Sequence, residues 1–479
     1  MKKTSLKINM LLSALKGLMS AVFPLISFPY ISRVLGVENL GKYNFASTFV
    51  LYFVLVANLG ITPYAIRECA IVRNEREKVD ELASDIFTIN VVSAFSAVIV
   101  MLFILFGTEK LQPYRLTIII LALQIPLNLI GVEWLFSAFE DYYYITIRSV
   151  AVQFLSIVML FCFVRSENSL VTYSIITVIS SAGASVLNWY NAKKYCNIRL
   201  KKVYRLKKHL KSIFILFAMT VAGTIYSSTD ITILGVICGD TSVGLYSVST
   251  KIYLVVKTVI SSIVLVSIPR LSSIVGTKDD KNFSETAGEI YSILLTFAIP
   301  AMIGLILLRK NIVAILAGLE YTQAQSSLLI LAVSLLFALG SYFWGQSVLI
   351  PLGKEKYVFC VTAIFALLNF ALNIILIPRY HENAAAFTTL LAEAGSFAMF
   401  KLKAHQYMAK SSEHHNLGKI IVGTVWIIIC NYSFLRIFGN SIIYICGTII
   451  TSVVGYFLIE YFLKNEVVSD AISKIKFKN

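Results

Sequence analysis

The chain has 479 residues, of which 57% are hydrophobic and 14% are charged, and its formal net charge is +16. Soluble domains contain about half apolar and about a quarter charged residues, so this composition excludes an ordinary soluble protein and is typical of a membrane protein. A helix that spans the bilayer needs about 20 apolar residues. Runs of that length recur along nearly the whole chain, and we therefore expect no separate soluble domain.

Apolar windows between polar breaks predict fourteen membrane-spanning helices, of which twelve form a core and two follow it. The first seven lie near residues 8–35, 43–66, 85–106, 115–139, 144–164, 169–191 and 212–237. The other seven lie near residues 243–269, 288–308, 325–350, 357–378, 383–404, 418–437 and 441–463. The N-terminal run has the basic head of a signal peptide, but it continues to about Leu35 without a small-residue cleavage site. We interpret it as an uncleaved first span.

The distribution of Lys and Arg predicts the orientation of these spans. The break between spans six and seven carries Lys193, Lys194, Arg199, Lys201, Lys202, Arg205, Lys207, Lys208 and Lys211. We place this loop in the cytoplasm, where it would face anionic lipids. An even number of spans separates it from each chain end, and the breaks on the opposite side are nearly uncharged. The pattern predicts a plasma-membrane protein with both termini in the cytoplasm and no nucleic-acid partner.

A short motif occurs twice along the chain. The stretch RVLGVENLGKYNFAST, Arg33 to Thr48, is matched by TILGVICGDTSVGLYSVST, Thr232 to Thr250. Each copy has Leu-Gly-Val at the end of one span, and Gly-x-Tyr followed by Ser-Thr at the start of the next. Because six spans separate the copies, the two halves would have the same orientation, which is a known transporter architecture. A chance match between loops of similar composition is the alternative interpretation.

The repeat predicts the domain organisation. We expect an N-terminal six-helix half at residues 1–195, a basic cytoplasmic linker at 196–211, a C-terminal six-helix half at 212–410, and two additional helices with a cytoplasmic tail at 411–479. The predicted fold is an all-α polytopic membrane protein in which two parallel six-helix halves surround a central cavity.

Ionisable residues inside a span are expensive in a bilayer and commonly mark a substrate or ion pathway. Four cations lie on the two spans that flank the expected cavity, namely Lys16, Arg33, Lys251 and Lys257. A cationic, water-filled cavity explains them together and would bind an anionic substrate. For each cation singly, a side chain that reaches the lipid headgroups is the alternative.

Four carboxylates also lie in predicted spans, namely Glu133, Asp230, Glu289 and Glu393. They are candidates for coupling to H⁺ or Na⁺, and for each one a structural ion pair is the simpler interpretation. Pro24 and Pro29 in the first span each remove a backbone donor and bend a helix. This helix is therefore a candidate gate, although kinks also occur in static membrane helices.

The motifs of several enzyme classes are absent from the sequence. It contains no P-loop, GxSxG or HExxH motif, and its five histidines lack metal-ligand spacing. An enzyme that transfers sugars in the membrane would need catalytic groups on sizeable outward loops, and the predicted outward loops are short. The seven cysteines form no CxxC pair and predict no disulfide framework. We expect neither an enzyme nor a resident metal or cofactor.

Two stretches in the N-terminal half, residues 28–70 and residues 133–149 (EWLFSAFEDYYYITIRS), resemble a known family. The first is similar to the N-terminal signature of bacterial polysaccharide repeat-unit flippases, and the second resembles their W-x-F-x-G-x-E stretch. This family includes the O-antigen flippases of the multidrug/oligosaccharidyl-lipid/polysaccharide exporter superfamily. Ala138 stands where the family usually has glycine. The positions that match this second stretch are Trp134, Phe136 and Glu140.

A third stretch, residues 368–393, resembles the family's C-terminal Asn-x-x-x-Asn-x-x-x-x-Pro and Gly-Ala-Ala region. The matching positions are Asn369, Asn373, Pro378, Ala384 and Ala385. His381 and Asn383 replace the glycines that the family pattern leads one to expect in the intervening loop. The three stretches extend over most of the chain.

The resemblance implies a flippase that moves undecaprenyl-pyrophosphate-linked oligosaccharides from the inner to the outer leaflet of the bacterial inner membrane by alternating access. A downstream polysaccharide polymerase would then use them. The pyrophosphate would be attracted to the four cations named above, because lysine is a common phosphate binder. The resemblance implies no cofactor beyond H⁺ or Na⁺ as a coupling ion.

Other functions remain as alternatives. A multidrug/cation antiporter of the same fold would favour a cavity of negative charge, which the four buried cations argue against. A flippase for lipid-linked peptidoglycan precursors is also compatible with the fold. From a different class, a membrane polysaccharide polymerase or ligase would need a catalytic external loop, and a structural scaffold would leave the intramembrane lysines unexplained.

Overall fold

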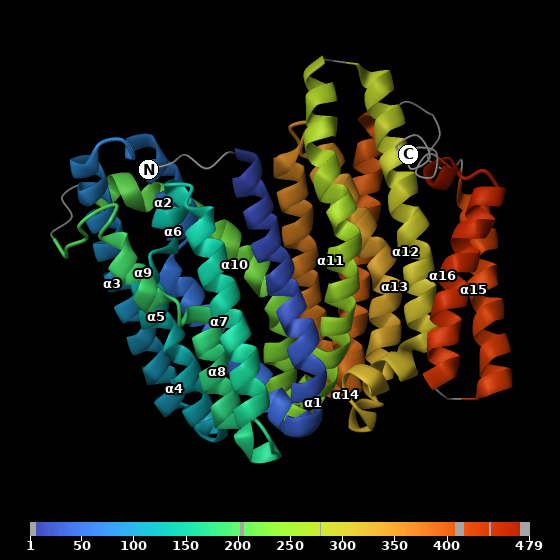
Figure 1. Ribbon diagram of the computed structural model, residues 1–479, viewed down its shortest axis with the longest axis horizontal. Coiled ribbons are helices and arrows are strands. Elements are labelled where there is room, and N and C mark those ends of the chain that lie inside the picture. Colours follow the sequence, from blue (N-terminus) through green and yellow to red (C-terminus); the bar gives the residue numbers. More distant parts are fainter. Residues whose placement is uncertain (1–5, 202–205, 278, 408–415, 440–441, 470–479) are drawn as a thin grey trace. The chain divides into compact units, whose positions relative to one another are not determined.

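The computed structural model describes residues 6–201, 206–277, 279–407, 416–439 and 442–469. Nearly all of these residues are helical, and the described chain contains no β-strand (Figure 1). Residue contacts divide the protein into two compact units, Met1–Gly244 and Leu245–Asn479. The all-α fold expected from the sequence is confirmed.

The first unit begins with one long helix and continues through shorter ones. Its helices are α1 (Leu6–Asn58), α2 (Ile61–Val72), α3 (Arg76–Gly107), α4 (Arg115–Ala122), α5 (Gln124–Gly131), α6 (Glu133–Ala138), α7 (Tyr142–Phe163), α8 (Leu170–Ala182), α9 (Ser185–Ala192) and α10 (Leu206–Ile237). Short 3₁₀ turns, η1 (Glu109–Tyr114) and η2 (Glu167–Ser169), precede α4 and α8. The unit ends within the first turns of α11 (Asp240–Thr277).

The second unit contains the rest of α11 and five further helices. These are α12 (Asp280–Leu316), α13 (Ala324–Tyr342), α14 (Glu355–Ala404), α15 (Leu417–Phe438) and α16 (Ile442–Phe462). A 3₁₀ turn, η3 (Leu319–Tyr321), precedes α13, a π-helical turn, η4 (Phe343–Leu349), extends it, and a 3₁₀ turn, η5 (His405–Tyr407), follows α14. Helices α12, α13 and α14 pack in sequence, and α15 joins the bundle through α12.

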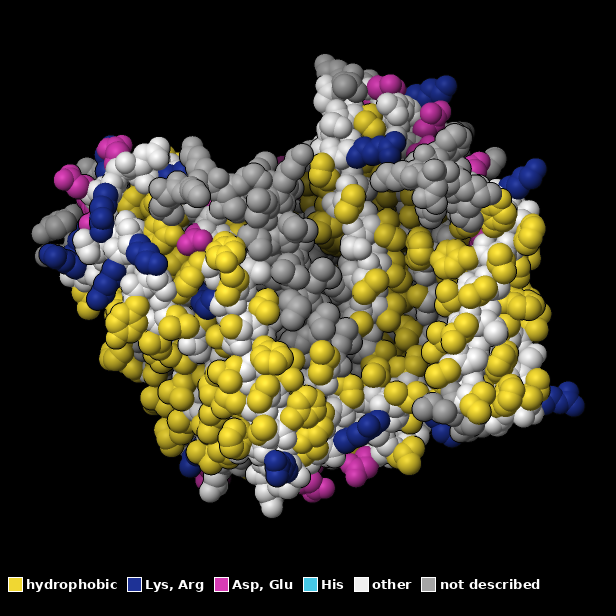
Figure 2. Space-filling view, viewed as in Figure 1, with side chains coloured by type: hydrophobic (Ala, Val, Ile, Leu, Met, Phe, Trp, Pro, Cys, Tyr) yellow, Lys and Arg dark blue, Asp and Glu magenta, His cyan; other side chains and the backbone are white. Residues whose placement is uncertain are grey.

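Eleven segments of the described chain are long and apolar enough to cross a membrane. Two of them join predicted spans across a break in the helix, at Gly36 in α1 and at His381 in α14. The seventh predicted span lies on α10, which carries two shorter apolar stretches. Every predicted span therefore lies on helix. Figure 2 shows apolar side chains over the long sides of the helices and charged side chains towards their ends, as in a multi-pass membrane protein.

Two predicted span boundaries are wrong. The second span does not continue to residue 66, because the backbone turns into the left-handed region at Leu59 (φ 44°) and Gly60 (φ 66°), and α2 starts afresh. The fourth span does not continue to residue 139, because Val132 (φ 33°) separates α5 from α6. Apolar side chains continue across both breaks, so hydropathy alone does not reveal a change in backbone direction.

Helix α10 packs against α1 and α2 and belongs to the first compact unit. The repeated motif instead predicts that residues 212–237 belong to the second half. Compactness and internal repetition are different properties of a chain, so the domain limits drawn from the repeat stay a prediction. The central cavity expected between the halves likewise stays a prediction.

The two copies of the repeated motif contact each other through glycines. A Cβ atom on Gly41 would overlap the carbonyl oxygen of Asp240, and one on Gly244 would overlap the carbonyl oxygen of Val37. Each glycine therefore lets its helix lie directly against the backbone of the other copy. Close by, the Tyr114 hydroxyl donates to Asp240 Oδ1 at 2.6 Å. The glycine of the Gly-x-Tyr sequence in each copy thus lies where its helix contacts the backbone of the other copy.

We expect Gly41→Ala to destabilise the first unit, because the added methyl group meets backbone rather than a movable side chain. Overpacking of this kind typically costs about 1–3 kcal/mol. The loss is measured as a lower melting temperature of the purified protein in detergent. The matched control is Gly107→Ala at the end of α3, where a Cβ has open space around it. Equal melting temperatures for the two variants would contradict the close packing at Gly41.

An extended segment of the basic linker lies along α3. Backbone N–H groups of every second residue donate to side chains spaced one turn apart on the helix: Asn197 to Asp80 at 2.9 Å, Arg199 to Ser84 at 3.1 Å, and Lys201 to Thr88 at 3.3 Å. Two residues of extended chain and four residues of helix both advance about 6 Å, so the two repeats stay in register. This part of the linker is therefore fixed to the first unit.

The break in α14 falls at His381, which has φ 49° and ψ −134°. Three buried side chains connect the helical segments on either side of it. Thr388 donates to Asn373 Oδ1 at 2.6 Å, and Asn373 Nδ2 donates to Asn369 Oδ1 at 3.0 Å. Two positions of the third resemblance stretch, Asn369 and Asn373, thus hold the two arms of the bend together. A histidine adopts the positive φ where the family pattern has glycine.

Candidate functional site

The second unit contains an ion pair inside two membrane-spanning segments. Lys257 Nζ on α11 lies 3.0 Å from Glu393 Oε1 on α14. Lys257 is near the middle of the 37-residue apolar segment Asp240–Gly276. The lysine side chain is 26% exposed, whereas the glutamate side chain is 9% exposed. The lysine side chain is therefore partly exposed, whereas the carboxylate that it pairs with is buried.

Two hydroxyl groups lie beside this pair. Tyr253, one turn before Lys257 on α11, places its ring 5.5 Å from the ammonium nitrogen, a distance typical of a cation–π contact. The Tyr253 hydroxyl is close to Lys257, Glu393 and Ser334 of α13. Both hydroxyl groups are buried, because Tyr253 is 5% exposed and Ser334 is 0% exposed.

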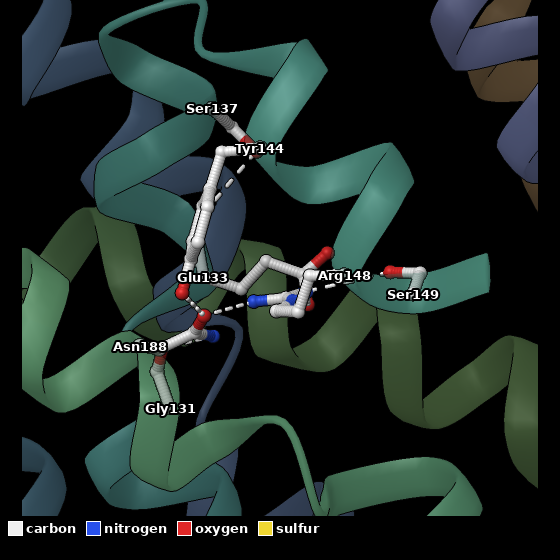
Figure 3. Close-up of polar contacts among 7 residues, drawn as sticks. All are labelled: Gly131, Glu133, Ser137, Tyr144, Arg148, Ser149 and Asn188. Atoms are coloured by element: carbon white, nitrogen blue, oxygen red, sulfur yellow. Dashed lines mark hydrogen bonds and ion pairs between the residues drawn. The ribbon is translucent and has the colours of Figure 1, made fainter. Parts of the chain in front are cut away.

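The first unit contains a second polar cluster, which is centred on Arg148 of α7 (Figure 3). Arg148 is 7% exposed. Its Nη1 donates to Asn188 Oδ1 of α9, and its Nη2 donates to Glu133 Oε2 of α6 at 3.2 Å. The Tyr144 hydroxyl donates to the same Asn188 oxygen at 3.2 Å. The guanidinium is thus buried with a charged and a neutral acceptor, as a buried cation requires.

Asn188 also explains how the fourth span can end inside the protein. The break at Val132 leaves the Gly131 carbonyl at the end of α5, and helix ends carry carbonyls with no partner in the helix. Asn188 Nδ2 donates to this oxygen at 2.7 Å. The cluster therefore joins α5, α6, α7 and α9 at one point. We interpret the cluster as a structural one that holds these helices together. The Glu133 side chain is 47% exposed, and Arg148, Asn188 and Gly131 are buried.

Sequence reasoning missed Arg148, although the signal was present. Arg148 lies four residues inside the predicted span 144–164, so the criterion that singled out Lys257 applies to it equally. Glu133 was named as a candidate, and the structure pairs it with Arg148. Asn188 carries no charge and has no distinctive spacing, so nothing in the sequence marks it.

The second resemblance stretch forms part of the core of the first unit. Trp134 and Phe136 are 6% and 0% exposed and pack in a cluster that includes Tyr64 of α2. Glu140, which has a positive φ of 59°, pairs with Arg73 at 2.7 Å. These three matching residues contact the protein itself and help fix α2 and α6 together.

The remaining predicted cations are distributed over both units. Arg33 on α1 is exposed in the first unit, and Lys251 on α11 is partly buried in the second. Lys16 lies in α1, but its side chain is outside the described residues. The role of these cations in binding an anionic substrate stays a prediction.

The other candidate positions are placed as follows. Asp230 on α10 is buried, and Glu289 on α12 is exposed. Pro24 and Pro29 lie within α1, where the helical backbone is interrupted at Gly36 and not at either proline. The helix that the sequence suggested as a gate is therefore interrupted at Gly36. Among the described residues, no group of three His, Cys, Asp or Glu side chains is arranged to hold a metal ion.

The fold and the apolar helices define a polytopic helical membrane protein. The same fold occurs in a solved structure of the lipid II flippase MurJ in an inward closed conformation, with a TM-score of 0.77 and 18% identity over 96% of this chain and 100% of that one. The chain belongs to the family of polysaccharide biosynthesis proteins, whose family model matches residues 6–275. The family resemblance drawn from the sequence is thereby confirmed.

Two known proteins are similar to this chain over most of their length. A putative O-antigen transporter of Escherichia coli strain K12 is 25% identical over 397 residues, which are 82% of this chain and 94% of the relative. The capsular polysaccharide biosynthesis protein CapF of Staphylococcus aureus is 24% identical over 387 residues, which are 79% of this chain and 93% of the relative.

Proposed function

We propose that the protein is a flippase that moves lipid-linked oligosaccharide repeat units across the plasma membrane. Family membership and the printed names of the relatives support transport of a polysaccharide precursor. The proposed substrate is an undecaprenyl-pyrophosphate-linked oligosaccharide, which a polymerase consumes after it reaches the outer leaflet. The protein acts as a transporter and performs no chemical step on the substrate.

One observation carries the proposal, namely the cationic side chain of Lys257, 26% exposed, in the middle of a membrane-spanning helix. A cation at this depth costs about 2.5–3.5 kcal/mol on insertion scales, so its retention indicates a use for positive charge there. Lysine binds phosphate well as a point charge. A pyrophosphate headgroup is the part of the substrate that such a cation would recognise, while the polyprenyl chain stays in the lipid.

The position of Lys257 also helps to distinguish the flippase from an antiporter and from an enzyme. An organic cation would be repelled by Lys257, which disfavours a multidrug antiporter. An enzyme that polymerises or ligates the sugars would need catalytic groups outside the bilayer, whereas Lys257 lies within a spanning helix. The proposed orientation, with both termini and the basic linker in the cytoplasm, puts the linker lysines and arginines next to anionic lipids.

The test is deletion of the gene from its own organism, followed by complementation. We expect the deletion strain to lose its surface polysaccharide and to accumulate lipid-linked repeat units in the inner leaflet, and the intact gene to restore both. Unchanged surface polysaccharide in a strain without other transporters of this family would contradict the proposed function. Accumulation of long unligated polymer on the outer leaflet would indicate a ligase instead.

A further inference from the structure

We infer that Lys354, Lys403 and Tyr407 form a binding site for the phosphate of an anionic phospholipid at the membrane surface. All three residues belong to the second unit. Lys354 directly precedes α14, Lys403 lies in the last turn of that helix, and Tyr407 ends the 3₁₀ turn η5 that follows it. The inference goes beyond the proposed function and does not depend on which substrate the protein transports.

The bend in α14 brings the two ends of this helix together. The helix is broken at His381, about halfway along its length. Near the two ends, the Tyr357 hydroxyl donates to the Met399 carbonyl oxygen at 3.2 Å. The backbone N–H of Lys354 donates to the Leu349 carbonyl oxygen at 2.9 Å, which fixes the turn before the helix. Residues from both ends of α14 therefore meet at one place.

The two lysine ammonium groups lie against Tyr407. Lys354 Nζ is 5.1 Å and Lys403 Nζ is 5.7 Å from the centre of its ring, which are distances typical of cation–π contacts. The Tyr407 hydroxyl lies at the surface and accepts hydrogen bonds from both ammonium groups. Two positive charges therefore converge on one exposed oxygen atom, where an anion from outside can reach them.

No carboxylate compensates these two charges within the described part of the chain. Their ammonium groups contact the rings of Tyr357 and Tyr407, the Tyr407 hydroxyl and the Gln406 side-chain amide, which are all neutral. Exposed lysines elsewhere have a carboxylate partner, as Lys281 has in Glu285 at 4.0 Å. Like charges that are held close together repel each other, and a bound anion removes this repulsion.

The chemistry of the three side chains fits a phosphate group. Lysine binds phosphate oxygens as a point charge, and the Tyr407 hydroxyl has a proton of its own to donate. Lys356, which is exposed, and Lys401, which is partly buried, add positive charge at the same two helix ends. Glu355 contributes the carboxylate nearest in sequence to Lys354, and it is exposed.

The position of the site favours a lipid over a soluble phosphate. The apolar segment Glu355–Tyr407 carries two predicted spans, so the site lies where these spans reach the membrane surface. Tyrosine is enriched at this depth. The predicted orientation puts this end of α14 in the cytoplasmic leaflet, where basic pockets between spanning helices bind the headgroups of anionic lipids.

Removal of either lysine is expected to weaken binding of an anionic phospholipid about tenfold, because it deletes one charge-assisted hydrogen bond to the phosphate. The changes are Lys354→Gln and Lys403→Gln, and the double variant should bind more weakly than either. Lys354→Arg keeps the charge and should retain most of the affinity. Because these side chains lie at the surface, each variant should melt close to the wild-type temperature when no lipid is added.

The experiment titrates phosphatidylglycerol into the purified full-length protein in a neutral detergent and counts bound lipids by native mass spectrometry. Phosphatidylcholine, inorganic phosphate and undecaprenyl pyrophosphate are titrated separately as other sources of phosphate. The control is Lys281→Gln, which removes an 83% exposed lysine from α12 of the same unit and should leave affinity unchanged. Tighter binding of phosphatidylglycerol than of phosphatidylcholine or inorganic phosphate, lost only in the Lys354 and Lys403 variants, would support the inference.

Three results would overturn it. Equal affinity of the wild type and the double variant for phosphatidylglycerol would show that these residues bind no lipid. Equally tight binding of inorganic phosphate, lost in the same variants, would assign the site to a soluble anion. Loss of affinity for undecaprenyl pyrophosphate with unchanged affinity for phosphatidylglycerol would assign it to the transported substrate. None of these results contradicts the proposed function, which deletion and complementation test separately.

Discussion

Lys257→Ala is expected to abolish surface polysaccharide while the protein remains in the membrane. The substitution removes the positive charge from the middle of α11. A charge-assisted hydrogen bond to the substrate contributes about 1.5–3 kcal/mol, or about 10- to 100-fold in binding. Surface polysaccharide and membrane abundance are measured in the deletion strain that carries the variant gene.

Two further variants separate loss of function from loss of stability. Lys257→Ala also leaves the sheltered Glu393 carboxylate unpaired, which destabilises the second unit. The double substitution Lys257→Met with Glu393→Gln removes both charges, so it should recover stability and still fail in transport. Lys281→Ala is the matched control, because this lysine is 83% exposed at the start of α12. Normal polysaccharide in both Lys257 variants would contradict the role of the cation.

Asn188→Leu is expected to be the most destabilising substitution in the first unit. It keeps the volume of the side chain but leaves the Arg148 guanidinium, the Gly131 carbonyl and the Tyr144 hydroxyl without the partner that joins them. Each buried group left unsatisfied costs about 1–3 kcal/mol. The expected result is a large fall in melting temperature and in the yield of folded protein.

The control for this prediction lies one turn away on the same stretch of chain. Asn191 Nδ2 donates to the Tyr144 hydroxyl at 2.9 Å but is only partly buried, so water can replace the lost contact in Asn191→Leu. We expect a clearly smaller effect there. If the two leucine variants melt at the same temperature, the cluster at Arg148 contributes little to the stability of the unit.

Much of the fold was predictable from the sequence, because hydropathy reports the length of each apolar run. Each predicted span lies on helix, and the repeated Leu-Gly-Val motif falls at the break at Gly36 of α1. The breaks at Leu59 and Val132 were not predictable, because both residues are apolar and neither favours the positive φ that it adopts. A left-handed backbone at such residues depends on packing that hydropathy does not contain.

The charged residues of the site were predictable from the sequence, but their partners were not. Lys257 and Glu393 stand out because charge is rare in an apolar helix, but their pairing joins residues that are 136 positions apart and needs the fold. Ser334 and Asn188 are uncharged and common in membrane helices, so no pattern marks them.

The most direct test of the account is transport of a lipid-linked oligosaccharide by the purified protein in liposomes. Substrate extracted from a strain that lacks the polymerase is reconstituted with wild-type protein, and its sugars are exposed to a reagent that cannot cross the membrane. Wild-type protein should bring the inner-leaflet substrate within reach of the reagent, whereas Lys257→Ala and protein-free liposomes should leave it protected. Equal protection with and without the wild-type protein, or equal rates for wild type and Lys257→Ala, would contradict the account.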